Sequence, residues 1–286
     1  MNNILELNGV FKSYKTFALE DITFALPRGF VMGFIGPNGA GKTTTIKLIL
    51  NMLQRNAGTI KVFGKDNIFY EQEIKEKIGV VMDNTFYVDE WSLKDIERTL
   101  KPFYKRWDSG KYNSFLSDFR LDVNKKVKEI SRGMKMKLMI AIALSHEADL
   151  LILDEPTSGL DAVARNELME ILSEFIEDEN KGVLFSTHVT PDLEKIADYI
   201  TVINNGRILY SGIKDDLLEK YVIIRGGLDV LDDEFKTKII GCREHNVGFD
   251  GLIDSSVLPL LPKNIITERS NLDEIIVRFN NWRENK

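Results

Sequence analysis

The chain has 286 residues, with 38 Lys and Arg against 44 Asp and Glu, which gives a formal net charge of −6. This length allows one large domain or a domain with an appendage, and a hydrophobic content of 43% supports a sizeable buried core. The acidic balance argues against a general nucleic-acid binder, so we expect no nucleic-acid partner. The single cysteine, Cys242, excludes an internal disulfide and argues against a cysteine-based zinc site.

The sequence contains no stretch that is long and apolar enough for a membrane-spanning helix. Such a helix needs about 18 or more apolar residues in a row. The best stretches are much shorter, at Phe30–Ile35, Leu138–Leu144 and Leu150–Leu153. The amino-terminal segment also lacks the basic and apolar regions of a secretory signal. We therefore expect a soluble protein of a reducing, cytoplasmic compartment.

The first part of the chain alternates short strand patterns with a helix. Strands are predicted at Ile22–Leu26 and Phe30–Ile35, and the second is so apolar that both of its faces should be buried. A helix is predicted from about Lys42 to Met52. Further strands are predicted at Thr59–Phe63 and Ile78–Met82.

A helical insert interrupts this alternation. The segment from about Ser92 to Glu147 is rich in charge, mostly helical in pattern and almost without strand signal. After it, the patterns predict strands at Leu150–Leu153 and Val183–Ser186 and a helix at Val163–Ile176. The dipeptide Asn205-Gly206 then predicts a hairpin between two strands, Tyr199–Asn204 and Arg207–Ser211.

The order of these elements predicts an α/β fold. Strands that alternate with helices form a parallel sheet, here with antiparallel strands attached. The pattern changes after Tyr221, where short strand and helix signals follow Gly226-Gly227. We expect a main domain of residues 1–220 and a small α+β appendage of residues 221–286.

The segment from Gly36 to Thr43 matches the phosphate-binding pattern G-x-x-x-x-G-K-[ST]. Glycines let backbone N–H groups turn towards phosphate oxygens, and the helix that follows presents its positive end to the same anion. Lys42 supplies charge for the β- and γ-phosphates, and the Thr43 hydroxyl suits Mg²⁺. A plain glycine-rich turn is the alternative. The predicted nucleotide-binding residues of this loop are Gly36, Asn38, Gly39, Ala40, Gly41, Lys42, Thr43 and Thr44.

The apolar run Leu150–Leu153 ends in two carboxylates, Asp154 and Glu155. Ligands of open α/β sheets bind at the carboxyl ends of the strands. Asp154 is suited to hold Mg²⁺ through water, and Glu155 is suited to polarise or deprotonate an attacking water. Solvated acids at a strand end are the alternative, which the phosphate motif upstream disfavours.

Over about residues 3–220, the sequence resembles the ATP-binding cassette of ABC transporters. Asp154–Asp161 reads D-E-P-T-S-G-L-D and is similar to the family's Walker B motif joined to its D-loop. Ile130–Met134 reads I-S-R-G-M and aligns with the signature L-S-G-G-Q. The resemblance implies a P-loop NTPase with a RecA-like core sheet, an antiparallel β subdomain and a helical subdomain at about residues 85–147.

The resemblance also implies roles for single residues. His188 falls where the family has its switch histidine, which contacts the γ-phosphate, and Tyr14 falls where an aromatic ring stacks on adenine. Two cassettes of the family face head to tail, so Ser131 and Gly133 would meet the ATP of the partner. The implied catalytic residues are Lys42, Asp83, Glu155 and His188, and the implied metal ligands are Thr43, Asp83 and Asp154.

Two departures from the family pattern concern the signature and Asp83. Arg132 and Met134 stand where the family has Gly and Gln, and Arg132 either adds charge near a partner's ATP or points to solvent. Asp83 stands where the family usually has Gln, and we hypothesise that it keeps a metal-side role. The S-R-G-M form resembles an exporter branch with ATPases of Gram-positive envelope-stress systems and of phenol-soluble modulin peptide exporters.

The resemblance therefore implies an ATP-hydrolysing subunit that uses ATP and Mg²⁺. It would dimerise with a second cassette, identical or different, around two ATP molecules. It would drive a separate membrane permease from the inner face of the cell membrane, with export of a peptide or an amphipathic or toxic compound. The alternatives are a soluble ABC-type ATPase in translation or DNA maintenance and, less favoured, a P-loop kinase.

Overall fold

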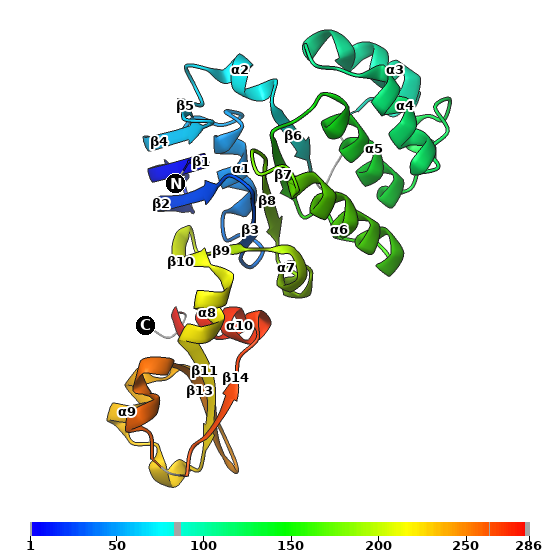
Figure 1. The fold of residues 1–286 in the computed structure, drawn as a ribbon. Coiled ribbons are helices and arrows are strands. Elements are labelled where there is room, and N and C mark those ends of the chain that lie inside the picture. Colours follow the sequence, from blue (N-terminus) through cyan, green and yellow to red (C-terminus); the bar gives the residue numbers. More distant parts are fainter. Residues whose placement is uncertain (1, 83–86, 263, 284–286) are drawn as a thin grey trace.

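The computed structural model describes residues 2–82, 87–262 and 264–283. Within these residues, the central sheet has six strands in the order β10-β9-β3-β8-β7-β6 (Figure 1). All neighbours pair in parallel except β9 and β10, which form the predicted hairpin. The strands are β3 (Phe30–Ile35), β6 (Ile78–Val81), β7 (Leu150–Asp154), β8 (Gly182–Thr187), β9 (Tyr199–Asn204) and β10 (Arg207–Ile213).

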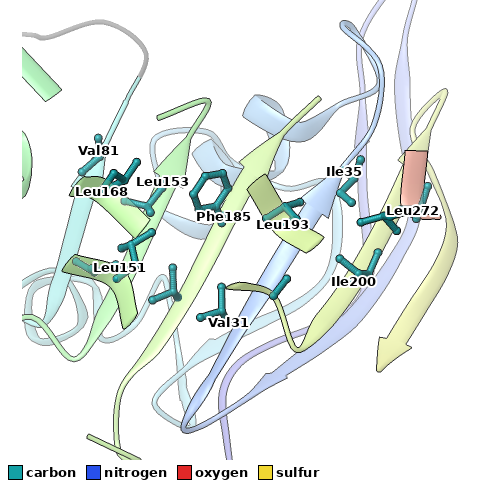
Figure 2. Close-up of a cluster of buried hydrophobic side chains, with 14 of the residues drawn as sticks. Val31, Ile35, Val81, Leu151, Leu153, Leu168, Phe185, Leu193, Ile200 and Leu272 are labelled. Carbon is teal, nitrogen blue, oxygen red and sulfur yellow. The ribbon is translucent and has the colours of Figure 1, made fainter. Parts of the chain in front are cut away.

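Both faces of the central sheet are buried, as the apolar strand patterns predict. Met32 and Phe34 of β3 pack with one cluster, whereas Val31 and Ile35 of the same strand pack with the opposite one. Figure 2 shows the second cluster, in which Phe185 of β8 lies between side chains of the neighbouring strands. Alternate residues of one strand therefore serve two hydrophobic layers.

An antiparallel sheet and helix α1 (Lys42–Ile49) cover the first face. The sheet has the order β2-β1-β4-β5. Its strands are β1 (Asn3–Ser13), β2 (Ala18–Pro27), β4 (Ala57–Val62) and β5 (Lys65–Asp66). The amino-terminal strand β1 was not predicted, and its pairing with β2 contains register shifts around Gly9, which has a φ of 58°.

The segment predicted as a helical insert is helical and has its own hydrophobic cluster. Helix α5 joins this cluster to the central sheet, because Leu138 and Ile142 face the insert while Ile140 and Ala143 face the sheet. In Figure 1 these helices lie at the top right. The elements of this region are α3 (Leu93–Leu100), η1 (Lys101–Phe103), α4 (Ser109–Asp118), η2 (Val127–Glu129) and α5 (Arg132–Ser145). Helix α2 (Glu71–Lys75) comes before β6 and packs through Ile74 with the cluster on the first face of the sheet.

The second face of the sheet packs against α6 (Ala162–Ile176) and α7 (Thr190–Ile196). Most predicted elements agree with the structure to within one or two residues. One exception is β2, which begins at Ala18 instead of Ile22. The other is the first helix, which ends at Ile49 instead of Met52, because Asn51 has a left-handed φ of 52° that stops the helix. Among the described residues, none of the helices has the length and apolar character that a membrane span requires.

The C-terminal region forms a third sheet with the order β12-β13-β11-β14, at the bottom of Figure 1. Its last helix, α10, returns to the main body and packs on α7. The remaining elements are α8 (Lys214–Lys220), β11 (Tyr221–Gly226), η3 (Leu228–Val230), α9 (Asp233–Lys238), β12 (Ile240–His245), β13 (Gly248–Asp254), η4 (Ser255–Leu260), β14 (Ile266–Arg269) and α10 (Leu272–Arg283).

His146, at the C-terminal end of α5, is a buried titratable group outside the candidate site. It is 1% exposed, and its ring stacks on Tyr104 with the ring centroids 4.0 Å apart. Within the described residues its Nδ1 has no hydrogen-bond partner. Burial lowers the pKa of His146 to about 4, because the charged form loses hydration.

This shift predicts that acid destabilises the fold through His146. Between the unfolded and folded pKa values the unfolded chain binds the proton and the folded chain does not, so stability falls as the pH falls. The loss is about 2 kcal/mol on going from pH 7 to pH 5. We expect His146→Phe to lose about 2 kcal/mol less than the wild type over this range, measured by urea unfolding. Tyr104→Phe keeps the stacked ring and should behave like the wild type. Equal losses in His146→Phe and wild type would contradict the prediction.

Candidate active site

The predicted phosphate loop connects β3 to α1 and requires glycine at two positions. A Cβ on Gly36 would lie 2.1 Å from the carbonyl oxygen of Ile203. Gly41 has a φ of 113°, and a Cβ there would lie 2.4 Å from Leu19. A Cβ on Gly39, by contrast, would meet no atom within 4 Å. The loop therefore lies tightly against β9 and β2 on one side and is open on the other, as a cradle for an anion requires.

Lys42 directs its ammonium group into this loop. It is 5% exposed, and its Nζ donates a hydrogen bond of 2.6 Å to the Gly36 carbonyl. The same nitrogen lies 3.2 Å from Oε1 of Glu155. A buried ammonium is stable only with such partners, so the loop and the end of β7 are held together by one positive charge.

Thr43 and Asp154 bring two oxygen ligands together beside the loop. The Thr43 hydroxyl donates to Oδ2 of Asp154 over 2.8 Å, and the Ser186 hydroxyl donates to Oδ1 over 3.1 Å. Burial raises the pKa of the Asp154 carboxyl, while these two hydrogen bonds act in the opposite direction. A hydroxyl and a carboxylate are the hard oxygen donors that Mg²⁺ prefers, so the residues present fit this ion.

Glu155 lies between Lys42 and His188. Its Oε2 is 2.8 Å from Nδ1 of His188, and the His188 backbone N–H donates to the same oxygen over 3.4 Å. Glu155 also has a left-handed φ of 52°, which is uncommon for a residue other than glycine. Its backbone N–H donates to the Ser186 carbonyl over 2.9 Å, which stabilises this conformation. A carboxylate fixed in this way can orient a water and accept its proton.

Tyr14 lies on the turn between β1 and β2, three residues before Phe17, whose ring borders the phosphate loop. Its ring is 46% exposed, and its backbone N–H donates to the Phe17 carbonyl over 2.7 Å. The Phe17 ring comes within 3.1 Å of the position that a Cβ on Gly41 would take. An exposed aromatic ring on the turn that borders this loop is suited to stack on a flat ligand.

The signature-like segment begins helix α5. Ser131 is the N-cap, and its hydroxyl accepts a hydrogen bond of 3.3 Å from the backbone N–H of Met134. Arg132 lies against Gly159, where a Cβ would be 3.0 Å from its guanidinium. A cavity of about 340 Å³ brings Arg132 and Lys135 of this helix to the same space as Glu155. Within the described residues, no hydrogen bond joins Ser131 or Gly133 to the phosphate loop.

The structure thus brings together five of the predicted site residues. These are Lys42, Thr43, Asp154, Glu155 and His188. Asp83 lies outside the described residues, and its metal-side role stays a prediction. Sequence reasoning missed Ser186, although β7 and β8 both end in polar residues. In the structure, the parallel register of β7 and β8 pairs Asp154 with Ser186. A prediction of this register would have identified Ser186.

Comparison with known proteins places the site in a family. A family model described as ABC transporter matches residues 19–158, which include the phosphate loop and the end of β7. The chain is 30% identical to the ABC transporter ATP-binding protein NatA of Bacillus subtilis (strain 168), over 71% of this chain and 84% of that protein. It is 29% identical to the bacitracin transport ATP-binding protein BcrA of Enterococcus faecalis, over 100% of this chain and 94% of that protein. The solved structure of an ATP-binding subunit of an ABC transporter has a TM-score of 0.69 and 30% identity, covering 75% of this chain and 91% of that one.

The close packing at Gly36 predicts a loss of ATP affinity in Gly36→Ala. The new methyl group would force the loop away from Ile203, and displacements of this kind cost about 1–3 kcal/mol. We expect ATP to bind about tenfold more weakly, measured by calorimetric titration. Gly64→Ala is the control: its φ of 77° also strains an alanine, but a Cβ there would meet no atom within 4 Å, so the variant carries backbone strain outside the loop without a clash. Equal ATP affinity in Gly36→Ala and wild type would contradict this account of the loop.

Proposed function

The chain belongs to the ATP-binding subunits of ABC transporters, and we propose that it drives the export of a peptide or an amphipathic or toxic compound. As a member of this family it binds and hydrolyses ATP and works with membrane permease components. The observation that carries the mechanism is the position of Glu155, held between the Lys42 ammonium and the His188 ring. We propose that the chain acts from the inner face of the membrane.

The proposed direction and cargo are supported by the relative that is named for bacitracin transport. Its alignment extends over the whole of this chain, including the C-terminal appendage, whereas the alignment with NatA covers 71% of it. Because this relative aligns with both the cassette and the appendage, it supports the proposal that this chain serves a related transport system. The I-S-R-G-M form of the signature, which resembles an exporter branch, points in the same direction.

In the proposed mechanism, Glu155 orients the water that attacks the terminal phosphate and accepts its proton. His188 holds one carboxylate oxygen through both its ring and its backbone, so the other oxygen is directed to the side of Lys42. Lys42 provides positive charge where negative charge develops on the phosphates during transfer. Lys42 and His188 both lie within 3.2 Å of the Glu155 carboxylate, so the proposed roles need no rearrangement of these side chains.

Thr43 and Asp154 would hold Mg²⁺, which would neutralise charge on the phosphates. Their oxygens are 2.8 Å apart, and Ser186 keeps the Asp154 carboxylate in its orientation. In our proposal Thr43 and Asp154 bind and orient the ion, and neither residue transfers a proton. Asp83 would act on the same side of the site.

We further propose that two cassettes close around two ATP molecules. In this arrangement Tyr14 stacks on adenine, and Ser131 and Gly133 meet the ATP of the partner cassette. The cavity lined by both Arg132 and Glu155 supports this proposal, because it connects the start of α5 with the carboxylate that we propose as the base.

An apolar cavity of about 280 Å³ is the proposed docking site for the permease. It lies between the central sheet and the helical region, and Tyr87 is one of its lining residues. Met52, which is 51% exposed, and Tyr104 also line it, and Phe103, the neighbour of Tyr104 in the chain, is 71% exposed. Exposed apolar side chains around a cavity are typical of a protein interface.

Glu155→Gln tests the proposed base. The amide cannot accept the proton, so we expect ATP hydrolysis to fall at least about 100-fold, because general-base catalysis contributes that much or more. ATP binding should be kept, and size-exclusion chromatography with ATP should show a dimer. Glu177→Gln, at an exposed position after α6, is the matched control and should hydrolyse ATP normally. Normal turnover in Glu155→Gln would remove Glu155 from this role.

Met52→Glu tests the proposed docking site. A charge in the apolar cavity must be desolvated when the permease binds, so we expect copurification with the permease to fall about tenfold or more. The ATPase rate of the isolated chain should stay within about twofold of the wild type, because Met52 touches none of the proposed catalytic groups. Leu260→Glu, at a position that is 80% exposed on the appendage, is the control. Unchanged copurification of Met52→Glu would exclude this cavity.

A further inference from the structure

Helix α7 follows His188 with one residue between them. Val189 is this link, and its backbone N–H donates to the Thr187 hydroxyl over 2.9 Å. Thr190, the first residue of α7, is 2% exposed. Two residues span at most about 7 Å, so the position of α7 fixes the position of the His188 backbone closely.

Helix α7 is held by the central sheet and by α6. Leu193 lies so close to β3 that a Cβ on Gly33 would be 2.6 Å from it. Arg165 of α6 lies 3.7 Å from the carboxylate of Asp192, which is 4% exposed. These contacts fix one side of α7, and the C-terminal region contacts its other side.

Helix α10 holds this other side through two hydrogen bonds. The Thr190 hydroxyl donates to Oδ1 of Asp273 over 2.9 Å, and the backbone N–H of Leu272 donates to Oε1 of Glu194 over 2.9 Å. Thr190 and Glu194 are one helical turn apart, and they meet adjacent residues in the first turn of α10. We call these four residues, Thr190, Glu194, Leu272 and Asp273, the α7–α10 contact.

The same helix is anchored by apolar packing. Leu272 and Ile275 are fully buried and belong to the main hydrophobic cluster together with Leu193. In Figure 2, Leu272 lies beside Ile200 and Ile35, at the edge of the cluster that contains Leu193. The Phe279 ring packs edge-on against Tyr221 with the centroids 5.2 Å apart. The first turn of α10 is therefore held in place by close packing, and it can support α7.

We propose that the C-terminal region positions His188, and that Thr190, Glu194 and Asp273 are its positioning residues. The α7–α10 contact fixes α7, and α7 fixes the turn that sets the His188 ring 2.8 Å from Glu155. This inference rests on the proposed function, which gives Glu155 and His188 their roles in hydrolysis. A change at the appendage that shifts α10 would then alter the hydrolysis rate without touching ATP.

Thr190→Val and Asp273→Ala test this proposal in the full-length chain. Each removes one partner of the same hydrogen bond, and valine keeps the shape of threonine. We expect kcat for ATP hydrolysis to fall about three- to tenfold with KM for ATP unchanged, the size that one lost hydrogen bond can produce. Thr190→Ser keeps the hydroxyl and should restore the rate. Thr237→Val is the matched control, because its hydroxyl bonds to Glu234 within α9.

A second readout follows the imidazole of His188 directly. The chain has three histidines, so the ring signals of His188 in NMR spectra are assigned by their loss in His188→Gln. We expect Thr190→Val and Asp273→Ala to shift the His188 signals and to leave those of His146 and His245 in place. Thr190→Ser should leave all three unchanged. Thermal unfolding checks that each variant is folded, and Asp273, an exposed residue, can be replaced with little risk to the core.

The outcomes separate this inference from the proposed function. Unchanged His188 signals together with an unchanged kcat in folded Thr190→Val and Asp273→Ala would overturn the positioning role. Full hydrolysis by His188→Ala would instead remove His188 from the proposed mechanism, while the NMR comparison would still report whether α10 positions its ring. The inference is supported when the signals and kcat change together and Thr190→Ser restores both.

Discussion

The candidate site depends on holding three charged side chains, two of them buried, at one edge of a sheet. Lys42 and Asp154 are buried and Glu155 is partly buried, so each would destabilise the fold if it had no partners. Lys42 is stabilised by a loop carbonyl and by Glu155, Asp154 by two hydroxyls, and Glu155 by His188. The partners come from the phosphate loop, α1, β7 and the end of β8. The register of the central sheet and the geometry of the site are therefore fixed by the same requirement.

Much of the fold was predictable because the central strands are continuous apolar runs. Such runs have one stable position, in the middle of a sheet covered on both faces, and β3, β7 and β8 occupy it. Strand β1 was missed because Gly9 and its register shifts break the alternation that a sequence search relies on. The end of α1 was misjudged because apolar residues continue beyond Ile49, where the backbone turns left-handed at Asn51.

The site was predictable where one motif contains its parts, and less so where it depends on pairing between distant strands. The phosphate loop and the Asp154-Glu155 pair are local patterns, so their residue types can be read directly. Ser186 lies 32 positions from Asp154 and reaches it only through the register of β7 and β8. The contact between Thr190 and Asp273 joins residues 83 positions apart, and no spacing rule connects them. Long-range hydrogen bonds of this kind become visible only in three dimensions.

The distance along the chain between α7 and α10 also has a consequence for biosynthesis. A ribosome adds about 5–20 residues per second, so the Asp273 codon is translated several seconds after the Thr190 codon. During this interval the phosphate loop, β7 and β8 are already synthesised, while the helix that supports α7 is still absent. The nucleotide-binding half of the cassette is therefore synthesised first, and the support for its histidine is synthesised last.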